Sequence, residues 1–210
     1  MNIQEQYLTA AKTGKALLIE KRSKFMSLTV SVSGEEAAKA EIARVRENHR
    51  EASHNCWCYI IRNGIERYSD DGEPQGTAGL PMLEVFKREG LSDVCCVVTR
   101  YYGGTMLGKG GLKRAYSEAA KLALDDAGIA EYKRHHCMDI TCSYNLSGKI
   151  KHELETFGVI LNDIQYTENV TFKIALLTAR SANLNKRLAD ITSGEIQGII
   201  TGTKYIAVSD

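Results

Sequence analysis

Residues 94–114 read VCCVVTRYYGGTMLGKGGLKR. The first eight of these residues form a nearly continuous apolar run, which is typical of a strand buried on both faces. Glycines crowd the segment that follows, and Leu112, Ala115, Tyr116 and Ala119 then recur at helical spacing. We therefore expect a buried strand, a glycine-rich loop and an amphipathic helix in direct succession.

A glycine-rich loop between a strand and a helix favours an anion, because backbone N–H groups and the helix dipole are directed toward it. The basic side chains are expected to contact phosphate, and two tyrosine rings offer faces on which bases stack. The candidate residues are Arg100, Tyr101, Tyr102, Gly103, Gly104, Gly108, Lys109, Gly110, Gly111, Lys113 and Arg114. The alternative is a tight strand-to-helix turn whose lysines are only solvated.

The spacing from Gly103 to Lys109 also matches the start of a phosphate-binding P-loop. A nucleotide-hydrolysing loop carries Ser or Thr after the lysine to hold Mg²⁺, whereas this chain has Gly110 there. Hydrolysis of a nucleoside triphosphate is therefore not expected from this loop.

An acidic turn, residues 70–74, precedes this stretch and reads DDGEP. Asp70, Asp71 and Glu73, together with His54 from an earlier predicted strand, form an alternative site for acid–base chemistry or Mg²⁺. The competing interpretation is structural, since such residues favour turns and support a following helix. We expect no metal and no cofactor, because the acids do not follow an EF-hand pattern and the nearby cysteines lack the usual zinc spacing.

The bulk composition is that of an ordinary globular protein of 210 residues, with 43% hydrophobic and 25% charged residues. A net charge of +1 names no partner, so any nucleic-acid surface must be a local patch. No apolar run approaches the roughly 18 residues that span a bilayer, and no signal peptide is recognisable, so a cytoplasmic location is expected. Six cysteines without a C-x-x-C pair predict free thiols.

The rest of the chain predicts two domains, residues 1–134 and residues 135–210. The first is expected to contain strands around 15–33, a helix opened by the capping-box pattern at 33–36 and running to about 48, a strand pair around the Asn63-Gly64 turn and a helix over 77–88. A polar junction at 131–136 marks the boundary. Beyond it the pattern predicts strand, helix, two strands, helix and strand, which is the ferredoxin-like βαββαβ plan.

Four ordered motifs, KRSKF at 21–25, ASHNCWCY at 52–59, YSDDGEPQGTAGLP at 68–81 and VTRYYGGTMLGKGGLKRAY at 98–116, resemble the IMPACT/YigZ family. The resemblance covers roughly residues 15–130, and the tail is similar to the second domain of bacterial members. It implies an α+β protein with two domains. The first would be a ribosomal-protein-like α/β domain similar to domain four of elongation factor G, and the second a ferredoxin-like domain.

The eukaryotic relatives are translation regulators, so the resemblance implies a cytoplasmic RNA- or ribosome-associated protein without intrinsic catalysis. A protein partner from the translation machinery is compatible with this role, and no membrane is expected. The alternative function is a small-molecule enzyme or nucleotide-binding protein that uses the acidic turn and the glycine loop.

Overall fold

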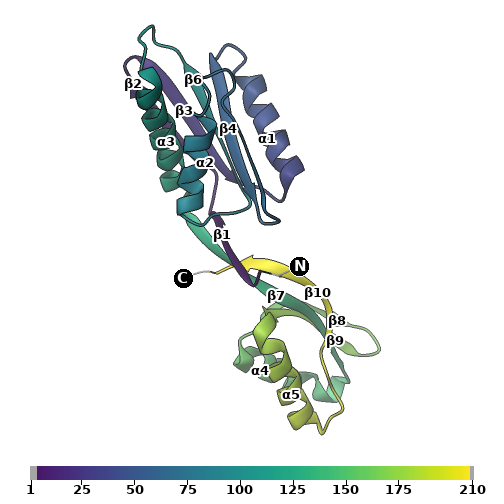
Figure 1. Cartoon of the computed structure of the whole chain (residues 1–210). Coiled ribbons are helices and arrows are strands. Elements are labelled where there is room, and N and C mark those ends of the chain that lie inside the picture. Colours follow the sequence, from purple (N-terminus) through teal and green to yellow (C-terminus); the bar gives the residue numbers. More distant parts are fainter. Residues whose placement is uncertain (1–3, 209–210) are drawn as a thin grey trace. The chain divides into compact units, whose positions relative to one another are not determined.

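The computed structural model describes residues 4–208. It divides into two compact units, one formed by residues 7–131 and the other by residues 132–208 together with residues 4–6. The boundary expected between residues 134 and 135 falls three residues after this division. Each unit combines a β-sheet with helices (Figure 1), which confirms the predicted two-domain α+β class.

The unit of residues 7–131 is built on an antiparallel sheet whose strand order is β2-β3-β6-β4-β5. The strands are β2 Gly14–Glu20, β3 Ser23–Ser31, β4 His54–Ile61, β5 Ile65–Ser69 and β6 Val94–Tyr101. Strand β6 lies in the middle of the sheet, and its first seven residues are buried. This central position explains the continuous apolar run in the sequence.

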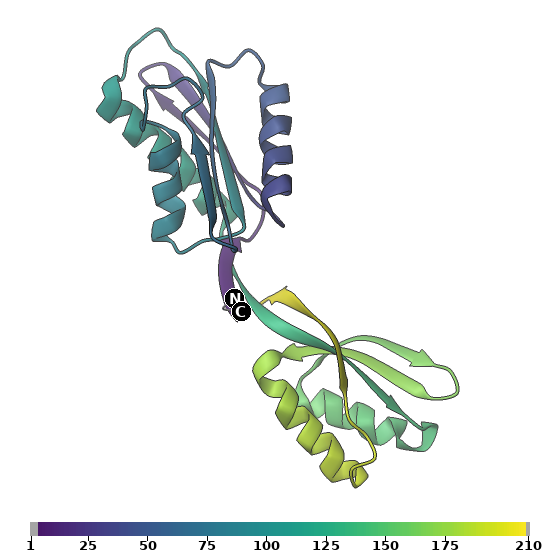
Figure 2. The same cartoon turned by 45° about the vertical axis from the view of Figure 1, so that its right-hand side comes forward.

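Helices cover this sheet unevenly. Helices α2 Gly79–Arg88 and α3 Gly108–Ala127 pack on one face, and α1 Glu35–Asn48 packs on the other (Figures 1 and 2). Helix α1 covers mainly the part of its face formed by β4 and β6. On the same face, Leu17, Ile19 and Met26 of β2 and β3 remain 41–60% exposed. The sheet therefore presents an open strip beside α1.

Three predictions for this unit need correction. The helix expected from Thr77 begins at Gly79, and strand β1 Gln6–Ala10 was not predicted. The glycine loop is shorter than expected, because α3 begins at Gly108 and its first turn contains the last three glycines of the stretch. Burial of Leu107 and Leu112 on either side of that turn outweighs the low helix propensity of glycine.

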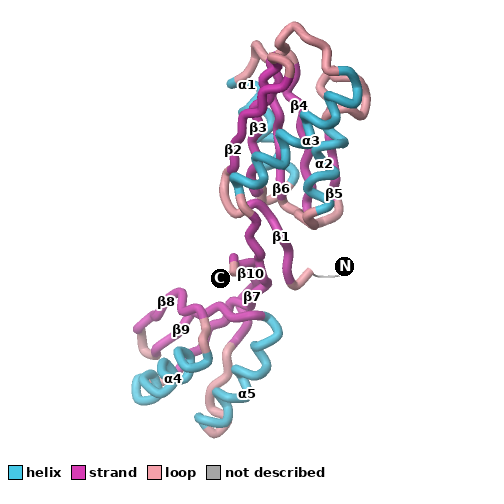
Figure 3. The backbone as a smooth tube through the Cα atoms, turned by 90° about the vertical axis from the view of Figure 1, so that its left-hand side faces the viewer, coloured by secondary structure: helices cyan, strands magenta, loops and turns pink. Residues whose placement is uncertain are grey.

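The second unit has the βαββαβ order β7 Ile129–Cys142, α4 Tyr144–Phe157, β8 Ile160–Tyr166, β9 Val170–Leu177, α5 Ser181–Thr192 and β10 Ile199–Ala207. Strand β7 pairs with both β10 and β9, and β9 pairs with β8, while the two helices share one core against the sheet (Figure 3). The ferredoxin-like plan is confirmed. The polar junction at 131–136 lies inside β7, where pairing with β10 begins at Tyr132, so this strand begins earlier than the predicted residue 136.

Over residues 4–208, no helix is both long enough and apolar enough to cross a membrane.

Candidate functional site

A cavity of about 440 Å³ lies where the acidic turn meets the start of α3. Its walls come from the first residue of β4, the acidic turn, the end of β6 and the segment that enters α3. The lining residues are His54, Glu73, Pro74, Arg100, Tyr102, Met106, Leu107, Gly108, Lys109 and Leu112. The acidic turn and the glycine stretch, which were separate candidates in the sequence, thus contribute to one cavity.

The sheet register places the polar side chains of this cavity. His54 on β4 is the pairing partner of Arg100 on β6, and Phe25 on β3 is the partner of Arg100 on its other side. Partners in adjacent strands project from the same face of a sheet. All three side chains therefore lie on the face that α2 and α3 cover.

A buried ion pair forms the floor of the cavity. Nη1 of Arg100 lies 2.7 Å from Oε1 of Glu73, and the two residues are 5% and 8% exposed. Tyr116 donates its hydroxyl hydrogen to the same carboxylate oxygen at 2.8 Å, and Arg100 donates from Nη2 to Oγ of Ser23 at 3.3 Å. These extra hydrogen bonds offset part of the desolvation cost of burying two charges.

The two oxygens of the Glu73 carboxylate differ in their hydrogen bonding. Both hydrogen bonds to this carboxylate within residues 4–208 go to Oε1, and Oε2 is not among the buried atoms without a partner, so it keeps access to solvent. His54 lies nearby, with Nε2 at 3.8 Å from Oε1 of Glu73, and its Nδ1 donates to the backbone oxygen of Asp71 at 2.8 Å. Because a carbonyl oxygen only accepts, the neutral His54 ring carries its hydrogen on Nδ1 and keeps Nε2 as an acceptor.

Two neighbouring groups stay protonated. Burial raises the pKa of the Tyr116 phenol, and the adjoining Cys56 and Glu73 raise it further. Burial also raises the pKa of the Cys56 thiol, which donates to the backbone oxygen of Asp70 at 3.0 Å. Tyr116 therefore acts as a hydrogen-bond donor at neutral pH, and Cys56 does not supply a thiolate.

The predicted acidic site is divided by the structure. The Asp70 carboxylate accepts hydrogen bonds from the backbone N–H groups of Gly76, Ala78 and Gly79 at 2.7–3.0 Å, and so supports the start of α2. The Asp71 carboxylate accepts from Arg46 and from the backbone N–H group of Asn55. Of the four predicted residues, Glu73 and His54 line the cavity. No cluster suited to a metal ion occurs among residues 4–208.

The predicted glycine and cation set is also distributed over several places. Gly103 serves packing, because a Cβ atom there would lie 2.1 Å from the carbonyl carbon of Arg22. Lys109 lines the cavity. Lys113 and Arg114 instead line a separate depression of about 540 Å³ between α2 and α3, together with Glu89 and Glu118.

A groove of about 310 Å³ adjoins the cavity through Tyr102, which lines both and is 50% exposed. Its other lining residues are Arg22, Lys24, Met26 and Tyr101. Sequence reasoning missed the two cations, Arg22 and Lys24, as site residues, although only Ser23 separates them in the segment KRSK at 21–24. Only the pairing of Lys24 with Tyr101 across β3 and β6 brings them to the tyrosines.

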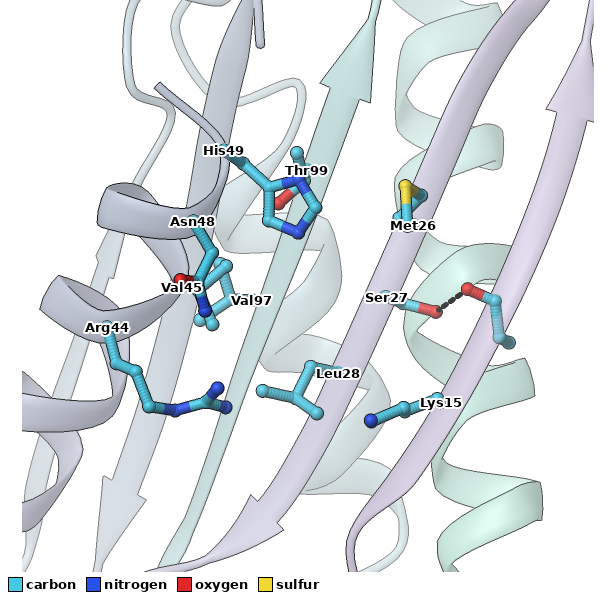
Figure 4. Close-up of a pocket in the computed structure, with 11 residues that line it drawn as sticks. Lys15, Met26, Ser27, Leu28, Arg44, Val45, Asn48, His49, Val97 and Thr99 are labelled. Carbon is cyan, nitrogen blue, oxygen red and sulfur yellow. Dashed lines mark hydrogen bonds between the residues drawn. The ribbon is translucent and has the colours of Figure 1, made fainter. Parts of the chain in front are cut away.

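A further cavity of about 240 Å³ lies on the α1 side of the sheet and shares Met26 with the groove. Figure 4 shows the side chains of Lys15 and Arg44 reaching toward Leu28 from opposite sides. Ser27 donates to the backbone oxygen of Ala16 at 3.4 Å within this cavity. The cationic surface of the groove thus continues along the open strip of the sheet.

Comparison with known proteins identifies both parts of the chain. The Impact N-terminal domain matches residues 21–124, and a domain of unknown function, DUF1949, matches residues 140–195. The IMPACT family member YvyE of Bacillus subtilis is 37% identical over 90% of this chain and 88% of its own length. The IMPACT family member YigZ of Escherichia coli is 35% identical over 84% of this chain and 89% of its own length.

A more distant match is Protein IMPACT of Bos taurus, which is 29% identical over 51% of this chain and 36% of its own length. Among solved structures, a crystal structure of a hypothetical protein superposes with a TM-score of 0.65 at 31% identity, covering 95% of this chain and 99% of that chain.

Proposed function

Because this chain belongs to the IMPACT family, and the resemblance to its eukaryotic members implies a role in translation, we propose that it is a cytoplasmic RNA- or ribosome-associated protein that acts in translation. Its RNA-binding surface is the groove of Arg22, Lys24, Met26, Tyr101 and Tyr102. That groove is the observation that carries the proposal.

The groove combines the two features that single-stranded nucleic acid needs. Arg22 and Lys24 are exposed cations that neutralise phosphates, and Tyr102 offers an exposed ring face for stacking. The hydroxyl of Tyr101 lies 2.8 Å from Nδ1 of His49, which holds that ring in place beside the groove. Lys15 extends the positive charge along the open strip of the sheet.

The depression that contains Lys113 and Arg114 is the less suitable surface. Glu89 and Glu118 line it together with the cations, so its net charge attracts phosphate less strongly. Among residues 4–208, none of those that line this depression is aromatic, so bases have no ring there on which to stack.

The proposal is tested by fluorescence polarisation with a labelled single-stranded RNA of about 12 nucleotides, within the site sizes usual for such grooves. Affinity is measured over a salt series for the intact chain and its variants. Arg22→Ala/Lys24→Ala should lower the slope of log affinity against log salt by about 1.4, since each phosphate contact on a single strand contributes about 0.7. Tyr102→Ala should weaken binding about 5- to 150-fold through lost stacking.

Lys12→Ala/Lys186→Ala is the charge-matched control, because both lysines are exposed and lie outside the groove. The control should bind like the parent chain. Equal salt slopes for the parent chain and Arg22→Ala/Lys24→Ala would overturn the proposal. A reduced slope in Lys113→Ala/Arg114→Ala alone would move the RNA to α3 and also overturn the groove assignment.

A further inference from the structure

We propose that the 440 Å³ cavity beside the groove is a ribonucleotide site. In this site Glu73 and His54 receive the ribose hydroxyls, Lys109 and the start of α3 receive the phosphate, and Tyr102 stacks on the base. The inference rests on the proposed function and names the nucleotide unit that the surface recognises, and binding of free monophosphates measures it independently of RNA affinity.

The size and lining of the cavity suit a small polar ligand. A volume of about 440 Å³ falls within the roughly 300–1,000 Å³ usual for small-molecule sites. Pro74, Met106, Leu107 and Leu112 supply apolar wall, and a few convergent polar groups lie at the floor and rim. This combination fixes the orientation of a ligand while its apolar surface is buried.

The floor of the cavity holds a carboxylate oxygen and a ring nitrogen that can accept hydrogen bonds, beside Arg100, whose buried Nε has no partner among residues 4–208. Oε1 of Glu73 already receives Arg100 and Tyr116, whereas Oε2 has no donor among the described residues, and the side chain is 3% exposed. Because Nδ1 of His54 donates to the backbone oxygen of Asp71, Nε2 is an acceptor whenever the ring is neutral. An accessible carboxylate oxygen accepts hydrogen bonds from ligand hydroxyls, and hydrogen bonds to a charged group are stronger than neutral ones. Carboxylates read ribose hydroxyls in this way in dinucleotide-binding folds.

Another part of the cavity lining is suited to an anion. Lys109 is exposed, and no ion pair engages it within residues 4–208. The first turn of the 20-residue helix α3 has no side-chain cap, so its backbone N–H groups and helix dipole are available to a phosphate. The open carboxylate oxygen of Glu73 is an observation independent of this helix terminus, and the two together specify a sugar phosphate.

Tyr102 connects this site to the groove. Its ring is half exposed, and the Arg100 guanidinium carbon lies 5.4 Å from the ring centroid. A base stacked on this ring would leave the remaining nucleotides of a chain free to follow the groove. The ligand is therefore either a free ribonucleotide or the 3′ end of an RNA, and both present ribose hydroxyls with a 5′-phosphate group.

The test uses isothermal titration calorimetry of the intact chain with adenosine and uridine 5′-monophosphates. Their 2′,3′-dideoxy counterparts should bind about tenfold or more weakly, because hydrogen bonds to charged groups are lost. Glu73→Gln should abolish this preference for ribose. Lys109→Ala should instead abolish the preference for the monophosphate over the nucleoside while the ribose preference remains. Lys12→Ala, an exposed lysine outside the cavity, should change neither ratio.

Circular dichroism and thermal melting establish that each variant is folded. The comparison of ribose with dideoxyribose in the parent chain needs no variant, so the test stands even if Glu73→Gln fails to fold. Absence of saturable binding at about 10 mM monophosphate, or equal binding of the dideoxy compounds, would overturn the inference.

The two sources are separated with an RNA whose 3′ nucleotide is 2′,3′-dideoxy. Weaker binding of that RNA than of its hydroxyl-ended counterpart places an RNA end in the cavity. Equal RNA binding with retained monophosphate binding identifies a free nucleotide. If monophosphates bind but Arg22→Ala/Lys24→Ala leaves the RNA affinity unchanged, the cavity site is supported and only the groove assignment is rejected.

Discussion

The guanidinium of Arg100 and the carboxylate of Glu73 lie 2.7 Å apart, and together they join the central strand β6 to the acidic turn. The pair lies beneath the cavity, where Tyr116 donates to the same carboxylate. Both side chains are almost fully buried, so neither charge is screened by solvent. Removing one partner and removing both should consequently have opposite effects.

Glu73→Ala is expected to lower the free energy of unfolding of the 7–131 unit by about 3–5 kcal/mol, because it leaves the Arg100 charge buried and unpaired. Replacing both residues, as in Glu73→Leu/Arg100→Met, should be neutral or stabilising by about 1–4 kcal/mol and should abolish ribonucleotide binding. Urea unfolding, monitored by circular dichroism, measures the free energies of unfolding of both variants. Titration calorimetry measures the loss of ribonucleotide binding. A cost below about 1 kcal/mol for Glu73→Ala would contradict the role of the ion pair.

Asp70→Ala is expected to destabilise the same unit by about 2–3 kcal/mol, because three backbone N–H groups near the start of α2 lose one carboxylate. RNA affinity should be unchanged once the variant is folded, since this carboxylate does not line the cavity or the groove. Asp125→Ala is a matched control, because its ion pair with Lys121 is exposed and should be worth less than about 1 kcal/mol. Equal unfolding midpoints for the two variants would refute the assigned role of Asp70.

Gly103→Ala should both destabilise the unit and weaken RNA binding. The new Cβ atom would lie 2.1 Å from the carbonyl carbon of Arg22, so the turn that carries Arg22 and Lys24 must move. Gly110→Ala provides the contrast, since a Cβ atom there meets nothing within 4 Å and lies in the first turn of α3. It should be neutral or stabilising by up to about 1 kcal/mol. Thermal melting measures the stability of both variants, and fluorescence polarisation measures their RNA affinity. Equal melting temperatures and equal affinities would argue against close packing at Gly103.

Stability should fall at alkaline pH. Burial raises the pKa values of Tyr116 and Cys56 above their unfolded values of about 10 and about 8.5. The folded state therefore holds protons that the unfolded state releases, so stability is fully present below the unfolded pKa and is lost as pH rises above it. Each group contributes a slope of about 1.4 kcal/mol per pH unit in that range.

Urea unfolding between about pH 8 and pH 11 measures this slope. Tyr116→Phe should make the decline shallower above about pH 10, because one buried acid has been removed. An unfolding midpoint that stays constant over the whole range would show that these groups do not titrate differently in the two states.

Local patterns were sufficient for much of the fold. The apolar run at 94–101 identified the central strand, and the Asn63-Gly64 pair identified the β4–β5 turn. The succession of strand and helix patterns over residues 136–207 identified the βαββαβ plan. Periodicity and turn chemistry act over a few residues, and these elements need nothing more. Where tertiary packing overrode local preference, as in the glycine-rich first turn of α3 and the polar part of β7, the sequence patterns misplaced the element ends.

The sequence by itself determined which elements form, which family motifs they carry and which residues are rich in chemistry. Only the tertiary structure decided how those residues are used, because register and chain crossing bring together side chains that lie far apart along the chain. Asp70 supports a helix, while Glu73, three residues later, meets Arg100 and lines a cavity. Arg100, which was predicted to contact phosphate, is buried and forms part of the cavity floor. The pairing of β3 with β6 places Lys24 beside Tyr101.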